Sequence, residues 1–174
     1  MINIKKSLII YFSRKGENYI NDGFVNLEIG NTKVIANMIK DLIDADMFEV
    51  EKKEDYPYGY YETTNIANIE KSKNTRPKLK NEISSIDEYD TIYVGYPNWW
   101  GTMPMPMFSQ LEKLNFKGKK IMPFCTHEGS KMGNSENDLQ KICVGADVKK
   151  GLAIFGSHVK TSKDQVKAWI KKGE

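Results

Sequence analysis

Short β-rich runs alternate along the chain with segments of helical periodicity, and this order constrains the fold more than any other feature of the sequence. The first run, residues 7–12, is nearly continuous in apolar side chains, which is typical of a strand buried on both faces of a parallel sheet. Similar patterns predict four further strands, at residues 46–51, 91–96, 120–125 and 151–156. Residues 46–51 alternate polar and apolar side chains, which favours an edge strand.

Helices are expected between these strands. Residues 31–43 place apolar side chains every three to four positions, as an amphipathic helix of about three turns requires. Ser162, with Gln165 three residues later, predicts a capping box at the start of a last helix. Three other segments are also expected to be helical: residues 64–74, 106–114 and 134–143.

Two parts of the chain fit this alternation less well. Residues 52–87 are polar and predict little beyond a turn at residues 56–59 and one of the helices above. Pro123 lies inside an expected strand, where proline removes a ladder hydrogen-bond donor.

Five strands that alternate with about five helices predict an α/β fold, a doubly wound five-stranded parallel sheet with helices on both faces. In such sheets ligands bind beyond the carboxyl ends of the strands, where the strand order reverses. The loops after the first, third and fourth strands are therefore the expected functional loops.

Composition limits the functions that this chain can have. Its 26 basic and 23 acidic residues are mixed along the sequence, and a net charge of +3 is too dispersed to indicate a nucleic-acid partner. Cys125 and Cys143 lack C-x-x-C spacing and histidines at metal-ligand spacing, so we expect no metal and interpret both as free buried thiols. Neither a membrane span nor a signal peptide is visible, so we expect a cytoplasmic protein without a membrane partner.

The loop after the first strand begins with Ser13 and Arg14 and ends at Asn31 and Thr32, where a helix is expected to start. Hydroxyls, glycines and a helix N-terminus favour a bound phosphate, because unpaired backbone N–H groups and the helix dipole attract anions. Neither the P-loop pattern nor the dinucleotide fingerprint occurs there. The alternative is a glycine-containing turn in which Thr32 caps the helix.

The loops after the third and fourth strands are also unusual. Trp99 and Trp100 are adjacent in the first of them, so we expect at least one indole to be exposed or to cover a planar ring. The alternative is that both indoles pack inward. Residues 126–133 contain glycines that permit close backbone approach, and His127 and Glu128 suggest either acid–base chemistry or a simple polar turn.

A phosphate site, an aromatic platform and an amide-rich loop on one rim describe a pocket for flavin mononucleotide (FMN). The sequence resembles the flavodoxin family and, more narrowly, the short-chain flavodoxin-like proteins of bacteria. The segments that carry the resemblance are residues 11–13, 30–32, 95–101 and 124–130.

The resemblance extends from the first strand to the last helix and implies one flavodoxin-like domain over residues 1–174, with strand order 2-1-3-4-5. The short fifth strand, residues 152–155, implies the short-chain form of the fold. The phosphate ligands that the resemblance implies are Ser13, Arg14, Asn31 and Thr32. The residues implied to surround the isoalloxazine are Pro97, Asn98, Trp99, Trp100, Gly101, Thr126, His127, Glu128 and Gly129.

The chain departs from the flavodoxin pattern in two ways. Residues 15–29 lengthen the phosphate loop, and this insertion could cover the flavin or bind a partner. Electron-carrying flavodoxins are typically acidic, which steers them to basic partners, whereas this chain has a net charge of +3.

The leading functional hypothesis is electron transfer through a non-covalently bound FMN, with a redox partner protein or a small molecule as acceptor. The alternative is an NAD(P)H-dependent FMN reductase of quinones or similar small acceptors, and a third possibility is a binding protein without a redox role. Small size and the lack of an obvious nicotinamide site favour the carrier, while the weak surface field favours the reductase.

Overall fold

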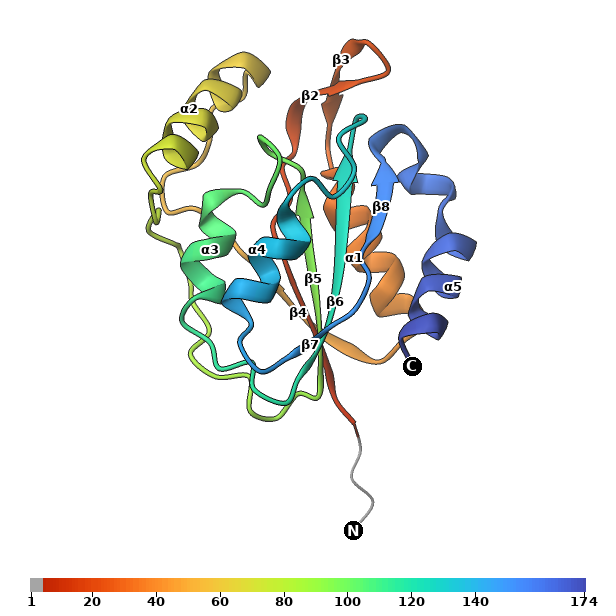
Figure 1. The fold of residues 1–174 in the computed structure, drawn as a ribbon. Coiled ribbons are helices and arrows are strands. Elements are labelled where there is room, and N and C mark those ends of the chain that lie inside the picture. The colour runs from red at the N-terminus through yellow and green to blue at the C-terminus, as the bar shows by residue number, and fades with distance from the viewer. Residues whose placement is uncertain (1–4) are drawn as a thin grey trace.

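A parallel β-sheet forms the centre of the computed structural model, which describes residues 5–174 (Figure 1). Its strands follow the spatial order β4-β1-β5-β6, and the last two strands, β7 and β8, both pair with β6. The predicted order 2-1-3-4-5 of the five expected strands is therefore confirmed. The strand bounds are β1 Ser7–Tyr11, β4 Ala45–Glu49, β5 Thr91–Pro97, β6 Lys120–His127, β7 Asp147–Val148 and β8 Leu152–Phe155.

Helices cover both faces of this sheet, as Figure 1 shows. One apolar core joins β1 and β5 to α3 and α4, and a second joins the other face of the same strands to α1 and α5. Among residues 5–174 no helix combines the length and hydropathy needed to cross a membrane. The helix bounds are α1 Asn31–Leu42, α2 Tyr60–Ser72, α3 Met105–Leu111, α4 Ser135–Ile142, the 3₁₀ helix η1 Gly156–Thr161, and α5 Lys163–Gly173.

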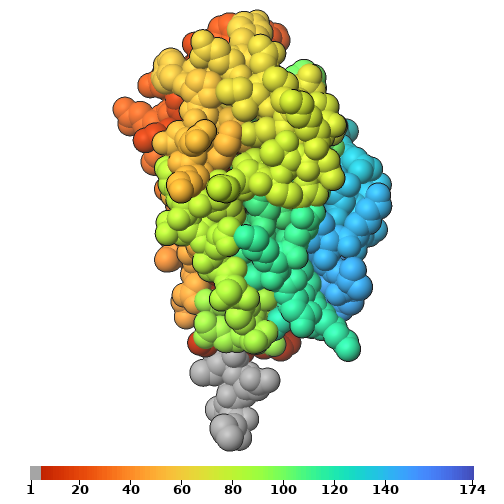
Figure 2. All heavy atoms as spheres, turned by 90° about the vertical axis from the view of Figure 1, so that its left-hand side faces the viewer, coloured from red at the N-terminus to blue at the C-terminus, as the bar shows by residue number. Residues whose placement is uncertain are grey.

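The inserted residues 15–29 contain a β-hairpin, which the sequence analysis did not predict. Strands β2 (Gly16–Ile20) and β3 (Gly23–Leu27) pair antiparallel in a separate two-stranded sheet. Asn21 and Asp22 connect them with φ of 51° and 62°, the conformation that a two-residue type I′ turn needs. The hairpin stands beyond the carboxyl end of the large sheet and lies against α2 and the segment before it (Figures 1 and 2).

Pro123 lies at a position of β6 where its missing N–H removes no hydrogen bond between strands. It pairs in register with Val94 of β5, but β7 pairs only with the start of β6 and β8 only with its end. Lys149 N donates to Ile121 O on the β7 side, so the backbone nitrogen of Pro123, two residues on, faces the gap between β7 and β8. The proline thus lies where no donor is required.

Two helix N-termini differ from the sequence expectation, α2 in its position and α5 in its capping. Helix α2 begins at Tyr60, four residues before the predicted start, because the polar segment gave no periodic signal there. Helix α5 begins after Ser162 as predicted, but the expected capping box does not form. The Ser162 hydroxyl instead donates to the carbonyl of Val159 over 2.8 Å, within the turn that ends η1.

Candidate functional site

A cavity of about 590 Å³ opens at the carboxyl end of the sheet, enclosed by the loops after β1, β5 and β6, the hairpin and α2. Ten residues that the sequence analysis singled out line it: Arg14, Asn31, Thr32, Pro97, Asn98, Trp99, Trp100, Thr126, His127 and Glu128. Ser13, Gly101 and Gly129 lie outside its lining, although each is next in sequence to a residue that lines it. Ser13 faces a second cavity on the other side of Arg14.

The polar end of the cavity lies at the start of α1. Ser13 Oγ accepts a hydrogen bond of 3.1 Å from Lys33 N, so the loop after β1 caps the first turn of the helix. Thr32 Oγ1 lies 2.8 Å from Thr126 Oγ1 and joins the start of α1 to the end of β6. The alternative in which Thr32 caps α1 is therefore wrong, because its hydroxyl is bonded elsewhere and the cap residue is Gly30.

Arg14 binds backbone carbonyls and fastens the hairpin to the chain before α2. Its two terminal nitrogens donate to the carbonyls of Glu17, Pro57, Tyr58 and Gly59. Glu17 completes the attachment, because its Oε1 accepts from Tyr60 N over 2.8 Å at the first turn of α2. Arg14 thus supplies positive charge at the cavity wall while its terminal N–H groups are already engaged.

The loop after β5 directs its two indoles differently. Trp99 packs edge-on against Phe12 and Tyr56, with ring centroids 5.1 and 5.0 Å away. Trp100 is 49% exposed, so the expectation that at least one indole is exposed is confirmed. Trp100 and Gly101 form a tight turn with φ of 55° and 86°, and a positive φ is costly for a residue as bulky as tryptophan.

The Trp100 loop is fixed from both sides. Trp100 Nε1 donates to Thr64 O in α2 over 2.9 Å, and Lys71 Nζ donates to Trp100 O. On the other side, Asn98 Oδ1 accepts from Gly101 N at 2.9 Å and Asn98 Nδ2 donates to Lys131 O at 2.8 Å. Asn98 thus joins the loops after β5 and β6, which form adjacent walls of the cavity.

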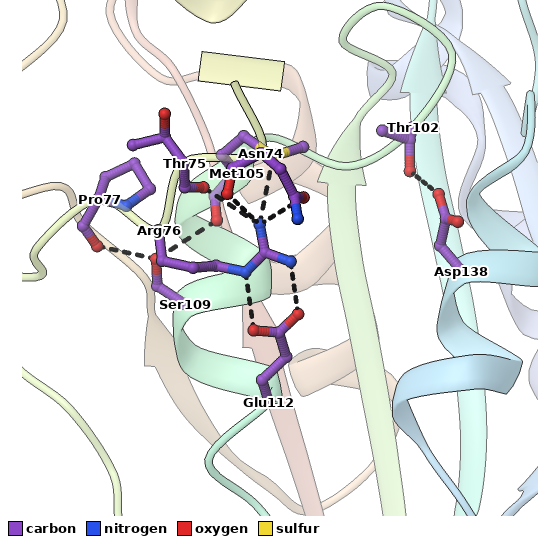
Figure 3. A network of polar contacts seen from close by, with 9 residues as sticks. All are labelled: Asn74, Thr75, Arg76, Pro77, Thr102, Met105, Ser109, Glu112 and Asp138. Atoms are coloured by element: carbon purple, nitrogen blue, oxygen red, sulfur yellow. Dashed lines mark hydrogen bonds and ion pairs between the residues drawn. The ribbon is translucent and has the colours of Figure 1, made fainter. Parts of the chain in front are cut away.

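Polar contacts farther from the cavity hold α2 and the loop after β5 in place (Figure 3). Arg76, in the segment after α2, binds both carboxylate oxygens of Glu112 at 2.7 Å each and lies over the Phe108 ring. This bidentate pair ties the end of α2 to α3 and its following turn. Thr102 Oγ1 donates to Asp138 of α4 and secures the end of the Trp100 loop.

The sequence analysis missed an aromatic surface formed by Tyr19 of the hairpin with Tyr60 and Tyr61 of α2, here called the tyrosine wall. Tyr19, Tyr60 and Tyr61 line the cavity, and Tyr19 packs 5.9 Å from Tyr60. Phe24 of β3 packs against both α2 tyrosines at 5.7 and 5.4 Å. The only sequence signals were the adjacent pair Tyr60-Tyr61 and the aromatic residues on either side of the Asn21-Asp22 turn.

Thr126 and His127 are the last residues of β6, not part of a loop as the sequence suggested. His127 is 7% exposed and its ring packs 4.4 Å from that of Phe155. Its Nδ1 accepts a hydrogen bond of 2.9 Å from Gly129 N. Burial, and secondarily the charge of Lys131, lower the pKa of His127 below its ordinary value.

Glu128 lies at the rim, beside the hairpin. Its Oε2 accepts a hydrogen bond of 3.4 Å from Asn21 N at the hairpin turn. Burial raises the pKa of Glu128, and hydrogen bonds from the backbone N–H groups of Asn21, Gly156 and Ser157 counteract that rise. Among the described residues that line the cavity, Arg14 is the one arginine and Glu128 the one carboxylic acid, and lysine and aspartate are absent.

The polar groups at the start of α1 and the aromatic side chains that line the cavity suit a flavin nucleotide. The start of α1 offers Asn31 and Thr32 for a phosphate, and helix N-termini favour anions. Trp99, Trp100 and the tyrosine wall offer aromatic faces for a planar ring. The enclosed volume lies within the range of small-molecule and cofactor sites.

This sheet order, with a polar and aromatic cavity at the carboxyl ends of its strands, defines the flavodoxin-like class of α/β proteins. A family model for flavodoxin matches residues 25–173, and the chain belongs to the flavodoxin family. No curated protein sequence matches the chain significantly.

Solved structures agree with this assignment. A candidate flavoprotein from Bacteroides uniformis ATCC 8492 is 29% identical, with a TM-score of 0.76 over 96% of this chain and 98% of that one. Another, from Bacteroides eggerthii DSM 20697, is 25% identical, with a TM-score of 0.75 over 95% and 96%. A flavoprotein from Lactobacillus acidophilus NCFM in complex with FMN is 26% identical, with a TM-score of 0.65 over 90% and 97%.

Proposed function

We propose that this chain binds one FMN non-covalently in the 590 Å³ cavity and transfers electrons through it. The observation that carries the proposal is the pairing of a polar end at the start of α1 with aromatic walls on one cavity. The FMN complex of the similar Lactobacillus protein supports the same cofactor. When bound, FMN supplies the capacity to accept and release one or two electrons.

The residues of this chain would hold and shield the cofactor. Asn31, Thr32 and the N–H groups at the start of α1 would bind the phosphate, with Arg14 adding positive charge. Trp99, Trp100 and Tyr60 would cover the ring and exclude water from it. A ring held between apolar faces disfavours a charged reduced form, which would lower its reduction potential.

Spectroelectrochemistry of the FMN-loaded protein tests this role. We expect reversible reduction at potentials displaced from those of free FMN, and single-turnover electron delivery to a one-electron acceptor such as cytochrome c. Potentials equal to those of free FMN would mean that the cavity does not tune the cofactor, and would contradict the proposal.

A second candidate function is NAD(P)H-dependent reduction of quinones or similar planar acceptors. It is favoured by the tyrosine wall, since Tyr19, Tyr60 and Tyr61 add an uncharged aromatic surface to the side of the cavity formed by the hairpin and α2. The net charge of +3 also gives no acidic field for steering to a basic protein partner.

Steady-state oxidation of NADH and NADPH with a water-soluble quinone separates the two candidates. Multiple turnovers without any partner protein would establish the reductase and end the pure-carrier proposal. Stable reduction by dithionite without turnover of either nucleotide would support the carrier.

A further inference from the structure

His127 is held in one orientation at the end of β6 by its own following turn. Gly129 N donates to His127 Nδ1 over 2.9 Å, which closes a short ring of backbone and side chain. Gly129 adopts φ of 134°, a conformation that residues with a Cβ rarely reach. A Cβ at this position would meet no atom within 4 Å, so the requirement for glycine comes from the backbone alone.

The Gly129 bond determines which nitrogen of His127 carries hydrogen. An Nδ1 that accepts from a backbone N–H cannot itself be protonated, so the remaining hydrogen of the neutral ring lies on Nε2. The surroundings favour the neutral ring, because burial and the Lys131 charge lower the pKa of His127. Glu128 and His158 are the other titratable groups of this corner, and Phe155 separates the rings of His127 and His158.

Nε2 is the free end of the ring. Within residues 5–174 it has no hydrogen-bond partner, yet no buried side-chain nitrogen or oxygen of this part lacks one. Nε2 is therefore accessible, and His127 lines the cavity. The neutral ring thus has a free N–H donor, and His127 is one of the residues that line the space in which the cofactor is proposed to lie.

We propose that His127 is a specificity-determining residue for the flavin ring, donating from Nε2–H to a carbonyl oxygen or imine nitrogen on the ring edge. Gly129 is the positioning residue that holds this tautomer. The inference rests on the proposed function for its ligand, and it assigns His127 a binding role. A neutral imidazole whose Nδ1 is occupied donates a hydrogen bond but does not supply a proton to a substrate.

The first test uses the protein without added flavin. Long-range ¹H–¹⁵N correlation NMR distinguishes the two neutral tautomers and the charged ring of each histidine. We expect His127 as the Nε2–H tautomer at neutral pH, with a pKa below the ordinary value of histidine. Gly129→Ala should release the ring to a mixture of tautomers, while Gly118→Ala, another positive-φ glycine with open space for a Cβ, should leave the His127 signals unchanged.

The second test measures binding of FMN and of riboflavin, which shares the ring but lacks the phosphate. His127→Phe keeps a flat ring against Phe155 but removes the donor, so we expect both flavins to bind about three- to tenfold more weakly. His127→Gln retains an N–H donor and should recover part of that loss. His158→Gln, outside the cavity lining, is the matched control and should bind both flavins normally.

These outcomes separate this inference from the proposed function. A loss confined to FMN would show that His127 serves the phosphate and would overturn the inference, as would an Nδ1–H tautomer or unchanged binding by His127→Phe. If the unaltered chain binds neither flavin, the proposed function fails together with the ligand assigned here. If it binds both and only the His127 results fail, the proposed function stands.

Discussion

Trp100 and Thr64 are joined by a hydrogen bond of 2.9 Å from the indole Nε1 to the Thr64 carbonyl. The bond connects the loop after β5 with α2, and both elements line the cavity. Two walls that come from distant parts of the sequence are therefore held at a set spacing before any ligand binds. Such preorganisation reduces the entropy lost on binding a planar ring.

Trp100→Phe tests this connection. The variant keeps an aromatic face but loses the bond to Thr64, so we expect the free energy of unfolding in urea to fall by about 1 kcal/mol. FMN should bind several-fold more weakly, since the spacing of the walls is no longer fixed.

The control for this variant is Trp169→Phe. Trp169 Nε1 donates a similar bond of 3.0 Å to Lys150 O, but Trp169 lies away from the cavity. It should lose stability without losing affinity for FMN. Equal affinity losses in the two variants would indicate general destabilisation and contradict a role for Trp100 in the site.

Arg14→Lys should detach the hairpin. A lysine ammonium cannot reproduce the fork that reaches the carbonyls of Glu17, Pro57 and Tyr58, and we expect a loss of about 2 kcal/mol in the free energy of unfolding. Limited proteolysis should then cut within residues 16–27 faster than in the unaltered chain. The neighbouring variant Lys15→Gln, at an exposed position, should show neither change, and a hairpin equally resistant in both variants would contradict the attachment.

The sequence predicted the large sheet because its signals are local. Each central strand is a short apolar run, and the helices between them show clear apolar periodicity, so order and topology followed from rules on parallel sheets. The site loops followed from their place after the strands, together with the unusual pairs Trp99-Trp100 and His127-Glu128.

The hairpin and its contacts depend on interactions that a single sequence does not display. A hairpin signal was present in the sequence, because Asn21 and Asp22 precede Gly23 and have β-forming residues on both sides. The sequence analysis interpreted this segment only as a lengthened loop. The fastening by Arg14 spans more than forty residues and has no local pattern. The tyrosine wall also has no local pattern, because it forms through a tertiary contact between the hairpin and α2.

Glu128→Gln should stabilise the protein at neutral pH. Burial raises the pKa of Glu128 in the folded state above its pKa in the unfolded chain. Once the pH exceeds the pKa of the unfolded chain, ionisation of this carboxyl therefore opposes folding. The advantage of the glutamine variant should therefore shrink as the pH falls through the pKa of Glu128 and vanish below the ordinary carboxyl range.

Affinity for FMN provides a second measurement on the same variant. Removing the rim charge should strengthen binding of FMN, which carries a phosphate, more than binding of riboflavin. Glu28→Gln, an exposed carboxylate in the loop before α1, is the control. Thermal melts that favour the unaltered chain at neutral pH would show that the hydrogen bonds of the carboxylate outweigh its burial.

The two cysteines should be inert in the native protein. Both are buried and unpaired as predicted, and burial raises the pKa of Cys143 to about 12 and that of Cys125 further. Since the thiolate is the reactive form, we expect a thiol reagent to label neither residue at mildly alkaline pH and to label both in denaturant. Rapid labelling of either cysteine in the native state would contradict the packing of β6 or of the turn after α4.

An absorbance spectrum, followed by titration of the flavin-stripped protein with FMN, measures whether the cavity binds this cofactor. We expect a bound-flavin spectrum and one tight site per chain. Riboflavin should bind more weakly, because it lacks the phosphate that the start of α1 is proposed to bind. A purified protein without flavin absorbance that also fails to bind added FMN would contradict the account, leaving a flavodoxin fold used for another purpose.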